Sequence, residues 1–100
     1  MDAALIDVAR WARRGRRRRD ALRVLAHANT PLTATELGNA LGIGMKKASE
    51  TLRQLLLRRL VHLLDHGKPF SRRYSATEEG RAVADWMESR QQPFVGCPRP

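Results

Sequence analysis

The spacing of apolar residues changes twice along this chain, and this limits its possible folds more than any other feature. Up to about residue 59, apolar side chains recur every three to four residues, as in helices. They alternate across residues 61–76, as in strands, and the helical spacing returns after Thr77. Helix-breaking sequence at Gly15, Pro31 and residues 42–44 divides the first part into four helices. This spacing therefore predicts a mostly α fold with a small β-hairpin (α+β).

The element boundaries follow from capping residues. We expect helices over residues 3–14, 20–28, 33–41, 45–59 and 77–90, and strands over residues 61–65 and 72–76. Asp20, Thr33 (or Thr35) and Thr77 are expected N-caps, since their side chains accept from free N–H groups of the first turn. The inward positions of the second to fourth helices are expected to be Leu22, Leu25, Leu37, Ala40, Leu41, Met45, Ala48, Leu52, Leu55 and Leu56.

Composition limits the partners. One hundred residues, 42% of them apolar, support one small core, and the net charge of +9 favours a polyanion. That partner is most often nucleic acid and less often an anionic membrane surface. A single cysteine, Cys97, excludes a disulfide framework within one chain, and no apolar run approaches the roughly 20 residues that span a bilayer. With no signal-peptide pattern at the acidic start, we expect a cytoplasmic protein without a membrane partner.

Two stretches carry a family resemblance: TELGNALGIGMKKASETLRQL (residues 35–55) and LVHLLDHGKPFSRRYSATEEGRAV (residues 60–83). They resemble the winged helix-turn-helix of prokaryotic transcription regulators, and within that class the MarR group. The resemblance covers roughly residues 20–90 and implies a winged helix-turn-helix with extra N- and C-terminal helices. Residues 1–19 would be an amphipathic helix with an arginine-rich segment, and residues 20–77 the DNA-binding domain. Residues 78–90 would be a dimerisation helix, and residues 91–100 a disordered tail.

The helix over residues 45–59 is the expected recognition helix. One side is apolar and the other polar, and the exposed residues near the start of such a helix reach base edges in the major groove. An ordinary solvated helix face is the alternative, which the preceding turn and the following basic hairpin disfavour. The candidate groove contacts are Lys46, Lys47, Ser49, Glu50 and Arg53. Arg53 could donate hydrogen bonds to guanine, and Glu50 could accept one from cytosine or orient an arginine. Either lysine could bind a phosphate instead of a base.

Three further groups of residues are expected beside this helix. Thr33 and Thr35 offer hydroxyl and N–H donors to a phosphate. The resemblance implies a wing that lies on the minor groove or the backbone, with the basic residues Lys68, Arg72 and Arg73; a solvated basic turn is the alternative. Six arginines in residues 13–19 have three possible roles: a phosphate clamp beside the groove, a basic arm that becomes ordered on DNA, or a soluble linker kept open by self-repulsion. Contact with DNA or RNA is the favoured one. The six arginines are Arg13, Arg14, Arg16, Arg17, Arg18 and Arg19.

The terminal helices carry apolar stripes that are large for a core of about 60 residues. In the resembled regulators such helices form a two-fold dimer interface, which spaces two recognition helices about 34 Å apart. The expected homodimer contacts are Leu5, Val8, Trp11, Val83, Trp86 and Met87. The alternative is that both helices fold back onto their own domain.

The sequence departs from the resembled pattern at the two ends of the recognition helix. Arg59 stands where the family usually has a glycine in the left-handed conformation, so the helix end is expected to differ. Gly44 replaces the usual Ser or Thr cap.

A metal site or an active site is not expected. His62 and His66 share one side of a strand from which Asp65 points away, and Cys97 lies in the tail. The chain has no phosphate-binding glycine loop, nucleophile elbow or paired carboxylates, so we expect neither catalysis nor a cofactor.

Three functions stay open. The first is a sequence-specific, homodimeric transcription regulator that binds double-stranded DNA, whose operator, effector and direction of regulation the sequence does not give. The second is a nucleic-acid-coating or RNA-binding protein without sequence preference, and the third is a winged-helix module that binds protein.

Overall fold

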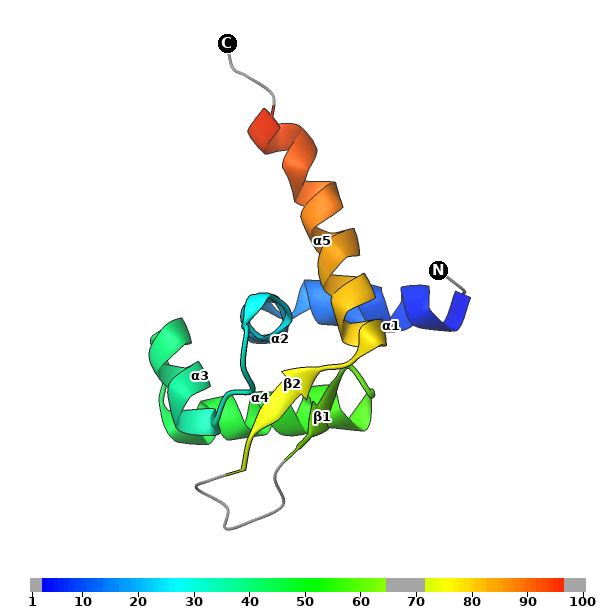
Figure 1. Cartoon of the computed structure of the whole chain (residues 1–100). Coiled ribbons are helices and arrows are strands. Elements are labelled where there is room, and N and C mark those ends of the chain that lie inside the picture. Colours follow the sequence, from blue (N-terminus) through cyan, green and yellow to red (C-terminus); the bar gives the residue numbers. More distant parts are fainter. Residues whose placement is uncertain (1–2, 65–71, 97–100) are drawn as a thin grey trace.

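The computed structural model describes residues 3–64 and 72–96. Five helices and a two-stranded hairpin follow one another in the expected order (Figure 1). The helices are α1 (Ala3–Arg14), α2 (Arg16–His27), α3 (Ala34–Leu41), α4 (Met45–Leu57) and α5 (Glu78–Gly96). The strands are β1 (Val61–Leu63) and β2 (Tyr74–Ala76), which pair antiparallel with Val61 opposite Ala76. The expected fold class, winged helix-turn-helix with terminal helices, is confirmed.

The core lies where α1, α2, α4 and α5 meet. Leu22, Leu25, Leu52, Leu55 and Met87 are among its fully buried side chains. Burying side chains of this size stabilises a fold by about 1.5–3 kcal/mol each, so this junction holds the helices in place. Leu32 adds a single antiparallel bridge to Tyr74, with N···O distances of 2.9 and 2.8 Å. The sequence did not indicate this bridge, because a single paired residue leaves no alternation of apolar and polar residues.

Helix α2 begins earlier than expected. Gly15 alone interrupts the helical chain, and residues 16–19 form the first turn of α2 instead of preceding an Asp20 cap. Arginine has a high helix propensity, and these residues continue a helix whose apolar face is already buried. Asp20 instead pairs with arginines on its own helix: Arg19 at 3.6 Å and Arg16 at 4.0 Å.

Helix α5 continues to Gly96, beyond the expected helix end at residue 90. The residues before Pro93 are good helix formers, and each added residue extends an existing helix by one hydrogen bond. Thr77 caps α5 as expected, since its Oγ1 accepts from the Gly80 N–H at 3.0 Å. In Figure 1 the C-terminal half of α5 projects away from the other elements.

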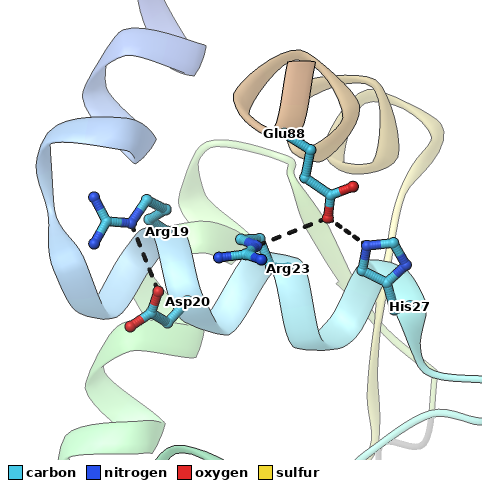
Figure 2. Close-up of polar contacts among 5 residues, drawn as sticks. All are labelled: Arg19, Asp20, Arg23, His27 and Glu88. Carbon is cyan, nitrogen blue, oxygen red and sulfur yellow. Dashed lines mark hydrogen bonds and ion pairs between the residues drawn. The ribbon is translucent and has the colours of Figure 1, made fainter. Parts of the chain in front are cut away.

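Polar contacts fix α5 against α2. Figure 2 shows the Glu88 carboxylate of α5 between Arg23 and His27 of α2, with Arg23 Nε at 3.7 Å and His27 Nε2 in direct contact. These partly exposed pairs contribute little energy, about 0–1 kcal/mol each. They join α5 to α2 at the edge of the core.

Two residues expected to face inward do not. Ala40 and Met45 are exposed, Met45 to 42%. Ala40 lies near the end of a short helix and Met45 opens α4, and end positions pack on fewer neighbours than central ones.

Candidate nucleic-acid interface

The turn between α3 and α4 is held by local hydrogen bonds. Gly42 ends α3 in the left-handed conformation, with φ of 72°, and the Ile43 N–H donates to the Gly38 carbonyl at 2.9 Å. Gly44 precedes α4 without a side-chain cap, as its lack of a side chain requires. This turn sets the angle at which α4 leaves α3, and therefore the direction of its exposed face.

Helix α4 is divided into a buried and an exposed face. Ala48, Thr51, Leu52 and Leu55 are buried. The Thr51 hydroxyl donates to the Lys47 carbonyl at 2.9 Å, which satisfies this polar group inside the core. Every candidate groove residue is on the opposite side and exposed to solvent: Lys46, Lys47, Ser49, Glu50 and Arg53. This face is available to a partner.

The hairpin lies along one edge of that face. Ser49 and Arg53 of α4 and Arg72 before β2 line a shallow hollow of about 430 Å³. Arg72 is exposed beside this edge of α4. Lys68 lies outside the described residues.

Arg73 turns away from the hollow toward the start of α3. Its Nη1 lies 3.6 Å from Glu36 Oε1 and donates to the Pro31 carbonyl at 3.4 Å. This arginine therefore joins the hairpin to α3, while its half-exposed side chain still adds positive charge nearby.

The start of α3 is a capping box. Glu36 N–H donates to Thr33 Oγ1 at 3.1 Å, and Thr33 N–H donates to Glu36 Oε1 at 2.9 Å. The Thr33 N–H lowers the pKa of the Glu36 carboxyl, and Arg73 adds to this effect. In this structure Glu36 accepts the Thr33 N–H, and phosphate binding by Thr33 stays a prediction. Thr35 is exposed in the first turn.

Arginines lie along the other edge of α4. Arg16 and Arg17 are exposed, and with Arg18 they line a hollow of about 370 Å³ whose far side is Glu50 and Gln54. The exposed face of α4 thus lies between two cationic edges, α2 on one side and the hairpin base on the other.

Arg14 is exposed, and three other arginines of residues 13–19 have separate contacts. Arg13 lies over the Trp86 ring at 5.2 Å, Arg18 lies over the Trp11 ring at 4.3 Å, and Arg19 pairs with Asp20. A free linker is therefore wrong: the segment is helical on both sides of Gly15.

The terminal helices bury more of their apolar stripes than expected. Val83 and Met87 are fully buried in the domain's own core. Helix α5 packs against α1 and α2, so intramolecular packing covers these two side chains in this structure. Leu5, Val8 and Trp86 are only partly buried at its edge.

Trp11 is also partly buried, and it has two arginine neighbours. Arg58, at the end of α4, lies over its ring at 4.4 Å, close to the distance for Arg18. Sequence reasoning gave Arg58 no role. Its place one turn after Gln54, on the α4 edge that faces α2, was the available signal.

Within the described ranges, no three His, Cys, Asp or Glu side chains gather in a way that could hold a metal. His62 is exposed on β1, whereas Asp65, His66 and Cys97 fall outside those ranges. No helix of the described chain is long and apolar enough to cross a membrane.

No protein-family model and no curated protein matches this chain. Solved structures match its fold. The Staphylococcus aureus MepR–DNA complex has a TM-score of 0.72 at 18% identity, over 92% of this chain and 77% of that one. A Mycobacterium tuberculosis MarR family protein has a TM-score of 0.67 at 22% identity, over 93% and 63%. Staphylococcus aureus MarR, in complex with salicylate and kanamycin, gives 0.66 at 20% identity, over 80% and 56%. The resemblance to MarR-type winged helix-turn-helix proteins is confirmed at the level of the fold.

Arg59 adopts the left-handed conformation that the resembled family usually has at a glycine. Its φ is 62°, in the left-handed region, so the end of α4 does not depart from the glycine pattern. Arg59 N–H donates to the Leu56 carbonyl and Leu60 N–H to the Leu55 carbonyl, both at 3.0 Å. These are the bonds of a Schellman motif with an arginine at the glycine position. They hold the chain in its direction toward β1.

Proposed function

We propose that this chain is a transcription regulator that binds double-stranded DNA with sequence preference, using α4 in the major groove. One observation carries the proposal. The exposed face of α4 presents six polar or charged side chains between two cationic edges, while its other face is buried in the core: Lys46, Lys47, Ser49, Glu50, Arg53 and Gln54. A major groove about 12 Å wide accepts one helix, and its walls are phosphate backbones. Cationic edges on both sides of the helix match those walls.

The structural neighbours support this use of the fold. MepR was crystallised with DNA and is a transcription regulator of a Staphylococcus aureus multidrug efflux pump. The identity is low, so residue roles for this chain are argued from its own chemistry.

Arg53 and Glu50 are the proposed base-reading residues. A guanidinium group donates two parallel bonds to guanine, and a carboxylate accepts from the cytosine amino group. Lys46, Lys47 and Ser49 contact either base edges or phosphates. In this proposal Arg16, Arg17 and Arg72 contact the backbone on the two sides, which adds affinity without sequence information.

We further propose that the chain acts as a homodimer through its terminal helices. Figure 1 shows the C-terminal half of α5 without a neighbouring element, and Leu5, Val8 and Trp86 lie at the edge of the core beside α1 and α5. A two-fold pair would place two copies of α4 about 34 Å apart, one turn of DNA. Sedimentation equilibrium tests this directly, and a monomer at micromolar concentration with and without DNA contradicts it.

The function is tested in two steps. The protein first selects preferred duplexes from a random pool, and its affinity for these duplexes is then compared with its affinity for random duplex. Arg53→Ala is expected to weaken binding to the selected duplex by about 1–3 kcal/mol and to relax one base position, leaving random duplex nearly unchanged. Arg81→Gln is the control, since this exposed arginine of α5 lies outside the proposed interface. If Arg53→Ala weakens both duplexes equally, Arg53 is a phosphate contact.

A second function has its own support. The arginines of α2 are a contact for any polyanion, whatever its sequence, and this favours a nucleic-acid-coating role. In that case no duplex is enriched over the random pool.

A further inference from the structure

Three side chains gather where α1, α2 and the end of α4 meet. We name Trp11, Arg18 and Arg58 the arginine–tryptophan cluster. The guanidinium carbons of Arg18 and Arg58 lie 4.3 and 4.4 Å from the centre of the Trp11 ring. Arg18 Nη2 also donates to the Trp11 carbonyl at 2.6 Å, which fixes the guanidinium group in place.

The cluster holds positive charge without a matching carboxylate. Among the described residues, neither of its two arginines forms an ion pair. Burial lowers the pKa of the Arg18 guanidinium, and the neighbouring charges of Arg14 and Arg58 lower it further. Arg18 Nε is buried and has no hydrogen-bond partner. Like charges held this close favour an anion that neutralises them.

There is room for an anion beside these groups. A hollow of about 250 Å³ is lined by Trp11, Arg18, Gln54, Leu57 and Arg58. It shares Arg18 and Gln54 with the hollow that runs along α4, so the cluster lies at one end of the proposed DNA-binding face.

We propose that the arginine–tryptophan cluster binds a phosphoryl group through the guanidinium groups of Arg18 and Arg58. A guanidinium group presents a planar set of donors that matches phosphate oxygens, and Gln54 adds an amide donor at the rim. If the proposed function holds, the group is a backbone phosphate beyond the bases that α4 reads. A free phosphate is the other source of the same chemistry.

The variant Gly15→Ala tests whether the position of the Arg18 charge matters, because it does not remove that charge. A Cβ at residue 15 would lie 2.4 Å from Arg18 Nε, so Gly15→Ala must displace that flexible side chain. The Gly15 backbone, with φ of −97° and ψ of 118°, is accessible to alanine. Gly15→Ala therefore moves the Arg18 guanidinium away from Trp11 while the net charge stays the same.

The first experiment measures phosphate binding by Trp11 fluorescence. The Trp86→Phe protein keeps Trp11 as the single tryptophan, and it is titrated with inorganic phosphate against sodium chloride at equal ionic strength. We expect a saturating change with phosphate alone. Gly15→Ala and Arg58→Gln should each weaken it roughly tenfold or more, the loss expected for a charge-assisted hydrogen bond. Arg81→Gln, which removes one charge elsewhere, should leave it unchanged.

The proposal is overturned if chloride gives the same change, or if both cluster variants titrate like the parent protein. Circular dichroism verifies the fold of each variant. Gly15→Ala and Arg58→Gln alter different elements. If one variant fails to fold, the other still tests phosphate binding by the cluster.

The second experiment identifies the source of the phosphoryl group. For DNA, Arg58→Gln should reduce the slope of log affinity against log salt by about 0.9, the value for one phosphate, with sequence preference unchanged. An unchanged slope beside a positive phosphate titration overturns the DNA source and supports a free phosphate. If the parent protein binds no DNA, the proposed function fails, and the phosphate titration still decides the site.

Discussion

Replacing Arg59 by glycine should stabilise the protein. The left-handed conformation, here with φ of 62°, costs an ordinary residue about 1–2 kcal/mol because its Cβ crowds the following carbonyl. Glycine avoids this cost but gains freedom in the unfolded chain, which offsets about 0.4–1 kcal/mol. We expect a net gain of about 0.5–1 kcal/mol for Arg59→Gly, or a rise in Tm of roughly 2–8 °C for a domain of this size.

The native conformation at Arg59 is held from both sides, so the variant should relieve strain and not change the fold. Its N–H donates to Leu56, and its carbonyl accepts from Thr77 Oγ1 at 2.8 Å. Thermal and urea unfolding of wild type, Arg59→Gly and Arg59→Ala are the assays. Arg59→Ala removes the same charge but keeps a Cβ, so it isolates the backbone effect. The reasoning is refuted if Arg59→Gly is no more stable than Arg59→Ala.

The other stability predictions use the same unfolding assays. Gly80→Ala should cost about 1–3 kcal/mol or more, because its Cβ would lie 1.9 Å from the Leu60 carbonyl oxygen. Gly44→Ala, whose Cβ meets open space, should cost less than about 1 kcal/mol, and equal losses contradict the clash. Glu36→Ala should destabilise at pH 7; because the folded pKa is lowered, the difference should shrink below about pH 4, and a pH-independent difference contradicts this. Glu88→Ala should cost under about 1 kcal/mol, since its ion pairs are partly exposed; a larger loss means that these pairs stabilise α5 substantially.

Local rules predicted much of this fold from the sequence. The N-caps Thr33 and Thr77 and the helix break at residues 42–44 act through residues within one turn of themselves, so their sequence signals are direct. The exposed face of α4 was equally predictable, because a strong helical period fixes which side chains share a face.

The differences have two sources: competition between local signals, and contacts between residues distant in sequence. Asp20 is a good N-cap type, but Gly15 and the arginines after it start α2 earlier. The apolar stripe of α5 is large for a small domain, yet α5 packs on α1 and α2, and Val83 and Met87 are buried. Trp11 was read as apolar, and its arginine neighbours come from two other elements, which no local pattern reveals.

The central claim, that the charged face of α4 and its cationic edges bind DNA, is tested most directly by fluorescence anisotropy. A labelled random duplex is titrated with the protein at salt concentrations from about 50 to 200 mM. The account predicts binding at the lowest salt that weakens about 10³-fold or more over this range, as expected when roughly 6–10 phosphates are engaged. No binding at 50 mM salt, despite the net charge of +9, would contradict it.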